Sequence, residues 1–155
     1  MRKEPILVYY VYRQGKDDAD LIDEIKDRLT PLKRKGIMTT WERKEIKAGG
    51  NVQKAIAGYV NTANIFLILV SARLLSSDSH ELEMVPAMER YNNNECIVVP
   101  IILRACDWTD APFASLQVLP RDEKALASEN SINLHTSLTE VMKEVKKIKI
   151  RRASC

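Results

Sequence analysis

Three short apolar runs alternate with amphipathic segments along the chain, and this alternation limits the possible folds more than any other feature. The runs are continuous and rich in β-branched and aromatic residues, which is typical of strands buried on both faces of a parallel sheet. They span residues 6–12 (ILVYYVY), 65–70 (IFLILV) and 96–103 (CIVVPIIL). Because parallel neighbours need crossover connections, we expect helices between these strands, on both faces of the sheet.

The segments between the runs carry apolar residues at helical spacing or short strand patterns. The sequence predicts a helix through positions 21–32 ended by Gly36, a strand over 38–41, a helix capped by Asn51, a helix from about Glu83, a weak strand near Ala125 and a helix over 137–149. The expected fold class is therefore α/β: a flavodoxin-like, doubly wound parallel sheet of about five strands with helices on both faces.

Length and composition indicate one intracellular domain. A chain of 155 residues supports one core, so we expect a single domain over residues 1–150, with 151–155 as a basic tail or the start of a linker. The net charge of +3 is too small to indicate direct nucleic-acid binding, and the apolar runs are too short to span a membrane. Three widely spaced cysteines predict neither a disulfide framework nor a metal site, which favours the reducing cytoplasm.

Common catalytic motifs of α/β folds are absent from the sequence. It contains no G-x-G-x-x-G, no G-x-x-x-x-G-K-[ST] and no G-x-S-x-G. A carboxylate cluster, Asp78, Glu81 and Glu83, instead follows the third apolar run, at the sheet edge where such folds bind ligands. Because Pro86 is tolerated best in a first helical turn, Glu83 is expected near a helix start, with its side chain exposed to solvent.

Six segments from the first strand to about residue 128 form a series with a characteristic order and spacing. They are Tyr9-Tyr10-Val11-Tyr12-Arg13, residues 41–49 (WERKEIKAG), residues 65–74 (IFLILVSARL), Ser79-x-x-x-Glu83, residues 100–108 with 112–113, and residues 119–120. This series resembles the Toll/interleukin-1 receptor (TIR) domain family, in particular its bacterial, NAD-hydrolysing branch. Residues 41–49 correspond to the BB loop of that family.

The resemblance implies an enzymatic activity centred on Glu83. TIR enzymes cleave NAD+ between nicotinamide and ribose with one glutamate at the end of a (Cys/Ser)-x-x-x-Glu motif, and Glu83 stands at that position. Nicotinamide leaves as a neutral molecule and needs no general acid, so one carboxylate that stabilises the oxocarbenium-like ribose is chemically sufficient. NAD+ would be the substrate, nicotinamide and linear or cyclic ADP-ribose the products, with no further cofactor and no metal.

The resemblance also implies roles for residues around Glu83. Tyr12 and Arg13 are expected near the nucleotide, and Arg43 or Lys44 would add a second positive group for the diphosphate. Trp41 is expected either in the core or as a platform for a ring, and Ser79 either orients Glu83 or caps a helix. The substrate-binding candidates are Tyr12, Arg13, Trp41, Arg43, Lys44 and Ser79.

TIR enzymes are activated by assembly, so the resemblance further implies partners. The BB loop of one protomer, here with Ile46, Gly49 and Gly50, would complete the site of the next, and a fused or associated nucleotide-sensing domain would drive assembly in a bacterial antiphage effector. Two alternatives stay open: a non-enzymatic TIR adaptor that signals by homotypic assembly, and a nucleoside-processing enzyme of similar topology. Glu83 favours the enzyme, and Glu83→Gln is expected to abolish turnover at little cost in stability because the side chain is expected to be exposed.

Overall fold

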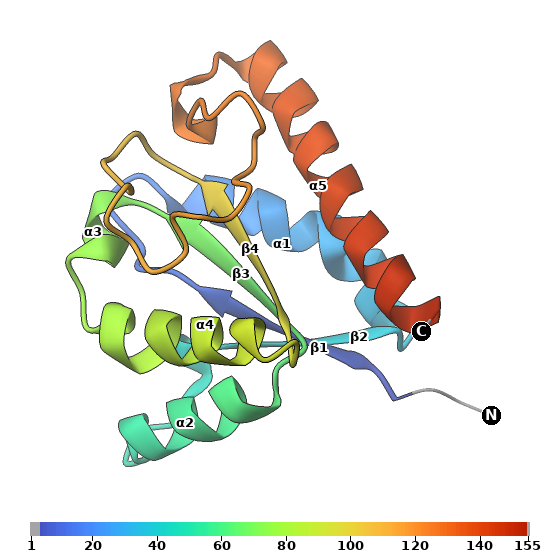
Figure 1. Ribbon diagram of the computed structural model, residues 1–155. Helices are drawn as coiled ribbons and strands as arrows, with labels where there is room; N and C mark the ends of the chain where they lie inside the picture. The colour runs from blue at the N-terminus through green and yellow to red at the C-terminus, as the bar shows by residue number, and fades with distance from the viewer. Residues whose placement is uncertain (1–3, 155) are drawn as a thin grey trace.

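A four-stranded parallel sheet forms the centre of the molecule (Figure 1). The computed structural model describes residues 4–154. The strands are β1 (Ile6–Val11), β2 (Met38–Glu42), β3 (Ile65–Val70) and β4 (Ile97–Ile102), in the order β2-β1-β3-β4. The helices are α1 (Ala19–Arg34), α2 (Val52–Thr62), α3 (Ala72–Leu75), α4 (Val85–Asn92) and α5 (Ser131–Ser154), with short turns η1 (Arg43–Glu45), η2 (His80–Met84) and η3 (Leu126–Ser128).

Helices cover both faces of the sheet, which confirms the predicted flavodoxin-like α/β fold. Side chains of α1 and α5 pack with Val8 and Tyr10 of β1 on one face. Side chains of α2 and α4 pack with Tyr9 and Val11 on the other. Because successive strand residues point to opposite faces, neighbouring tyrosines of β1 take part in different cores.

The expected fifth strand near Ala125 is not formed, and that prediction is wrong. The chain beside β4 makes only an isolated parallel bridge between Ile101 and Leu119. Pro120 follows directly and has no N–H with which to extend the ladder. Ala125 instead precedes the 3-10 turn η3, so the edge of β4 is covered by irregular chain.

The helix that follows the acidic cluster begins in an unusual way. Residues 80–84 form the π-helical turn η2, and regular α-helix starts at Val85, two residues after Glu83. Pro86 lacks the N–H that an α-helix would donate to the carbonyl of Leu82, so the regular bond pattern cannot extend back through it. The prediction of a helix start near Glu83 is confirmed, but the wide turn directs the side chain inward.

Two further features concern the helices of residues 4–154. α5 begins at Ser131, six residues earlier than the expected 137, and extends to Ser154. None of the helices in this part of the chain combines the length and the apolar character that crossing a bilayer requires.

Candidate active site

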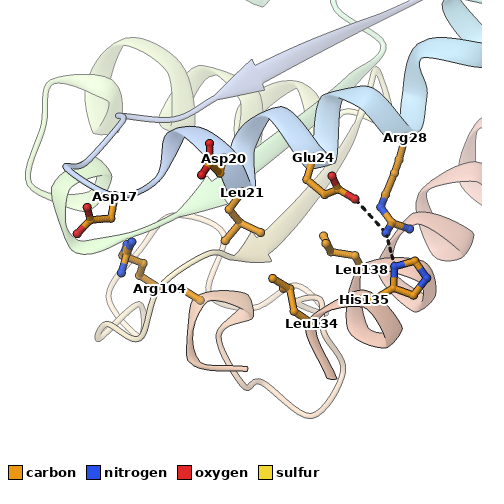
Figure 2. A pocket seen from close by; sticks show the side chains of 10 residues that line it. Asp17, Asp20, Leu21, Glu24, Arg28, Arg104, Leu134, His135 and Leu138 are labelled. Atoms are coloured by element: carbon orange, nitrogen blue, oxygen red, sulfur yellow. Dashed lines mark hydrogen bonds and ion pairs between the residues drawn. The ribbon is translucent and has the colours of Figure 1, made fainter. Parts of the chain in front are cut away.

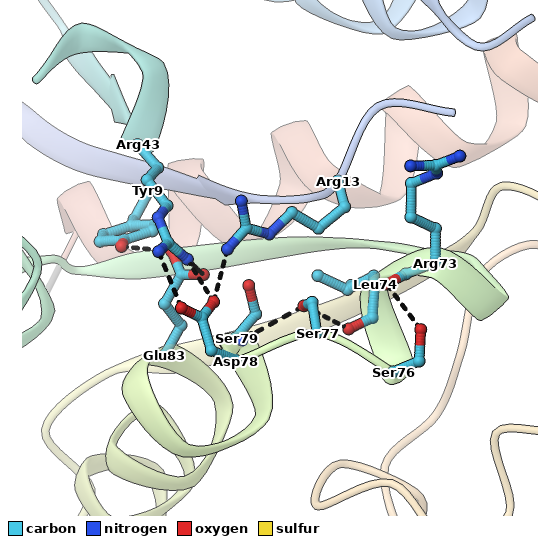
Figure 3. Close-up of polar contacts among 10 residues, drawn as sticks. All are labelled: Tyr9, Arg13, Arg43, Arg73, Leu74, Ser76, Ser77, Asp78, Ser79 and Glu83. Carbon is cyan, nitrogen blue, oxygen red and sulfur yellow. Dashed lines mark hydrogen bonds and ion pairs between the residues drawn. The ribbon is translucent and has the colours of Figure 1, made fainter. Parts of the chain in front are cut away.

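Four charged side chains converge beyond the carboxyl ends of β1, β2 and β3 (Figure 3). Arg13 follows β1, Arg43 follows β2, and Asp78 and Glu83 lie between α3 and α4, after β3. Parallel strands end at one edge of a sheet, so loops far apart in sequence meet there. The sheet topology therefore brings the predicted residues Arg13, Arg43 and Glu83 together.

Glu83 is buried, with 1% of its surface exposed, so the expectation of an exposed side chain is wrong. Its Oε2 accepts a hydrogen bond from the hydroxyl of Tyr9, and its Oε1 lies 3.9 Å from Nη1 of Arg43. The cause is the π-helical turn η2, which points residue 83 toward the sheet rather than toward solvent. One carboxylate oxygen is thus held by a neutral donor and the other faces a cation.

Tyr9 holds Glu83 from within the core. Its ring is fully buried and lies 5.0 Å from the Trp41 ring and 5.3 Å from the Phe66 ring, centroid to centroid. Burial, and next the charge of Glu83, raise the pKa of Tyr9 far above its usual value, so the hydroxyl keeps its proton and acts as a donor. The carboxylate is therefore fixed by a residue that packing has already immobilised.

Asp78 binds both arginines at the mouth of the site. Its two carboxylate oxygens accept from Arg43 at 2.6 Å (Nη1–Oδ1) and 3.0 Å (Nη2–Oδ2), and Oδ1 also accepts from Arg13 Nη2 at 2.5 Å. The hydrogen bonds from Arg43, with those from Arg13, lower the pKa of Asp78 to about 2. The hydrogen bonds to Asp78 raise the pKa of Arg43, so Asp78 and Arg43 both stay charged at neutral pH.

Ser79 is enclosed beside this cluster. The residue is fully buried, and within the described part of the chain its Oγ has no hydrogen-bond partner. The same holds for Nε of Arg13. Buried polar atoms normally have a hydrogen-bond partner. Two buried polar atoms without one, next to a charged cluster, therefore indicate a place where a polar ligand would form hydrogen bonds.

Tyr12 and Lys44 belong to a different network, on the α1 side of the sheet. The Tyr12 hydroxyl donates to Glu42 Oε1 at 2.6 Å, Lys26 Nζ lies 2.5 Å from Glu42 Oε2, and Lys44 Nζ lies 3.4 Å from Oε1. Burial acts to raise the pKa of Glu42, but the bonds from Lys26 and Tyr12 outweigh it and leave that pKa lowered. The structure therefore does not bring Tyr12 and Lys44 to Glu83.

Trp41 lies in the core, which is one of its two expected places. It is 6% exposed and stacks on Tyr59, with ring centroids 4.2 Å apart and planes 9° from parallel. Its ring is thus already covered by another aromatic ring.

The predicted assembly residues lie in the loop after η1. Ile46 packs partly against the core, Gly49 has a φ of +82°, and Gly50 bonds back to the Lys47 carbonyl at 2.9 Å. A Cβ at Gly49 would meet nothing within 4 Å, so the positive φ, rather than crowding, favours glycine there.

Tyr9 belongs to the candidate site although the sequence does not single it out, and the sequence assigns no role to Asp78. The alternation of side chains along β1 could have indicated Tyr9, because residues 9, 11 and 13 point to the same face and Arg13 is a predicted site residue. Tyr12 points to the opposite face.

A separate cavity of about 450 Å³ lies between α1 and α5 (Figure 2). Within it Arg28 Nη2 donates to Glu24 at 3.2 Å and contacts His135 Nδ1 at 3.1 Å. The cavity is on the α1 side of the sheet, and Glu83 is not among the residues that line it. Among residues 4–154, no group of three His, Cys, Asp or Glu side chains is placed to hold a metal ion.

Comparison with known proteins places the chain in a family. The TIR domain model matches residues 8–140. The uncharacterised protein y4lF of Sinorhizobium fredii is 44% identical over 120 residues, which cover 77% of this chain but only 36% of that relative. The match over most of the chain, with a parallel α/β fold that agrees with it, shows that the protein belongs to the TIR domain family.

Proposed function

We propose that the protein is a TIR-domain NAD+ nucleosidase that releases nicotinamide and ADP-ribose. The observation that carries this proposal is the carboxylate of Glu83, fixed by Tyr9 beyond the carboxyl ends of the strands, with Arg43 beside it and Arg13 bound to Asp78 at the mouth of the site. A fixed negative group next to positive groups matches a substrate that joins a cationic ribosyl centre to a diphosphate.

The reaction needs one bond broken and one formed. The bond between ribose C1′ and the nicotinamide nitrogen breaks, both electrons go to the nitrogen, and neutral nicotinamide leaves. The Glu83 carboxylate stabilises the oxocarbenium-like ribose, and water adds to C1′ and loses a proton to the carboxylate or to solvent. In a cyclised product an adenine nitrogen takes the place of the water.

Binding follows from the remaining contacts. Arg13 and Arg43 would hold the diphosphate, and the open hydroxyl of Ser79 would bind a ribose or phosphate oxygen. Tyr12 and Lys44 would act through the Glu42 network, which fixes the start of η1 and hence Arg43. Trp41 would act by packing against Tyr9.

Assembly and biological setting form the wider part of the proposal. The loop after η1, with Ile46, Gly49 and Gly50, would contact neighbouring TIR protomers in a homo-oligomer, and a fused or associated nucleotide-sensing domain would control assembly. The setting would be cytoplasmic antiphage defence in bacteria.

One observation favours a second candidate, a non-enzymatic adaptor that signals by homotypic assembly. Glu83 is only 1% exposed, and the Asp78 ion pairs lie at the mouth of its site. An adaptor requires only the fold and the loop, with no open site.

NAD+ consumption by the assembled protein separates the two candidates. The chain is fused to an inducible oligomer, and NAD+ loss and nicotinamide release are measured with and without Glu83→Gln. We expect turnover at least about a hundredfold lower in the variant, as for loss of a main electrostatic stabiliser. The melting temperature should change little, because glutamine fills the same space and still accepts from Tyr9.

Each result then has a clear meaning. Equal turnover in both proteins would reject the role of Glu83. No NAD+ loss in the assembled unmodified protein would favour the adaptor.

A further inference from the structure

Two guanidinium groups share a single carboxylate at the mouth of the candidate site (Figure 3). Arg13 and Arg43 both bind Asp78, and Arg43 uses two of its nitrogens for it. Paired donors of this kind fit a phosphate as well as they fit a carboxylate. The donors that a diphosphate requires are therefore already occupied.

We propose that Asp78 is an internal competitor for the diphosphate of the substrate, and that binding requires its carboxylate to leave Arg13 and Arg43. This inference rests on the proposed function and adds a regulation of that same site. A diphosphate and the Asp78 carboxylate compete for the same three nitrogen atoms. The bonds to Asp78 would therefore lower the affinity of the site for the diphosphate by a constant factor.

Exposure indicates which group can move. The Asp78 side chain is 51% exposed, whereas the side chains of Arg13 and Arg43 are 32% and 20% exposed and that of Glu83 is 2% exposed. Asp78 can therefore turn into solvent and regain hydration, while both arginines stay largely in place. Its departure would also uncover the Oε1 side of Glu83, where Arg43 stands at 3.9 Å.

Two open polar atoms support this exchange independently. Ser79 Oγ and Arg13 Nε are buried without a hydrogen-bond partner in the described residues, so Asp78 does not satisfy the whole site. A diphosphate has more acceptor oxygens than a carboxylate and can reach such donors in addition to the guanidinium groups. Asp78 thus leaves part of the hydrogen-bonding capacity of the site unused, which favours its displacement by a diphosphate.

Charge keeps this competition active under physiological conditions. Since Arg43 and Arg13 lower the pKa of Asp78 to about 2, the carboxylate stays ionised throughout the neutral range. A change in pH near neutrality would therefore not open the site. Displacement by an anion, or movement of the loop that carries Arg43, would open it.

Inorganic pyrophosphate is the direct probe, because it contains the competing group without the rest of the substrate. Its binding to the purified chain is measured by isothermal titration for the unmodified protein and for Asp78→Asn. We expect about tenfold tighter binding in the variant, since several partly exposed ion pairs no longer compete. Asp78→Asn combined with Arg43→Gln should lose this gain.

The matched control is Glu81→Gln, which removes one negative charge from the same segment. Glu81 is 74% exposed at its side chain and pairs only with His80 among the ion pairs of the described residues, so pyrophosphate affinity should not change. Asp78→Ser serves as a second variant if the asparagine protein folds poorly. Circular dichroism and the melting temperature verify the fold of each protein.

Equal or weaker pyrophosphate binding by both folded Asp78 variants would overturn the inference, because Asp78 would then position the arginines instead of competing for them. This outcome is distinct from failure of the proposed function. Titration does not depend on turnover, so tighter pyrophosphate binding without NAD+ cleavage would uphold the competitor and reject the nucleosidase.

Discussion

The side chain of Tyr9 takes part both in the core and in the candidate site. Its ring packs between Trp41 and Phe66, and its hydroxyl donates to Glu83. Packing keeps the hydroxyl in place, and the raised pKa keeps it protonated. Without this donor, the buried carboxylate would keep the ion pair with Arg43 at 3.9 Å as its one ion pair among residues 4–154.

We predict that Tyr9→Phe lowers kcat about tenfold and leaves KM nearly unchanged. The ring remains in the core, but a hydrogen bond to a charged group, of about 1.5–3 kcal/mol, is lost. Steady-state kinetics of the assembled protein measure the effect. Tyr10→Phe is the matched control, because Tyr10 is equally buried but packs on the α1 face. A similar loss in both variants would indicate a general packing effect and contradict the prediction.

At the scale of elements, β1 connects two polar networks through its two faces. Tyr9 meets Glu83 on one face, and Tyr12, just after the strand, meets Glu42 on the other. Glu42 is the last residue of β2, and Arg43 begins η1 directly after it. The pair between Lys26 and Glu42 therefore fixes the segment that carries Arg43 into the site.

We predict that Lys26→Met destabilises the protein by about 1–3 kcal/mol and raises KM for NAD+. Removing Lys26 from this partly buried pair leaves the Glu42 charge less compensated, but Tyr12 and Lys44 still contact Glu42 and reduce the cost. Urea unfolding measures the stability, and Lys33→Met, an exposed change on the same helix, is the control. Adding Glu42→Gln should restore part of the stability, and no restoration would argue against charge as the cause.

Element identity could be predicted from the sequence, but side-chain direction only in part. Continuous apolar runs predict the buried strands, and helical spacing predicts the main helices. The expected strand near Ala125 was wrong because Pro120 stops pairing after Leu119. The burial of Glu83 depends on a π-helical turn, for which hydrophobic periodicity has no signal. Alternation in β1 would have separated Tyr12 from Tyr9.

At the scale of the whole molecule, ionised carboxylates link stability to pH. The pKa of Asp78 is lowered from 3.8 to about 2, and that of Glu42 is also lowered. A native-state pKa below the unfolded value means that the folded protein binds fewer protons at acidic pH. The stability from Asp78 is therefore present above about pH 4 and lost as the pH falls toward 2. The stability from Glu42 is likewise lost as the pH falls below the ordinary pKa of its carboxyl group.

We predict that the urea midpoint of the unmodified protein falls between pH 4 and about pH 2, the range bounded by the two pKa values of Asp78. Asp78→Asn should show a shallower fall because the titrating group is gone, although Glu42 still contributes. Half of the Asp78 side chain is exposed, so the difference should be small and should shrink at high salt. Parallel curves for the two proteins would contradict the prediction.

The burial of Glu83 has a consequence for how a lineage of such chains would evolve. A carboxylate in the core makes folding less favourable than a methionine or leucine of similar size would. Where nothing selects for the glutamate, random mutation therefore tends to replace it, and an apolar replacement would make the folded chain more stable. A descendant used only for assembly would be free to make that exchange, and a glutamate at position 83 would persist only under continued selection for its charge.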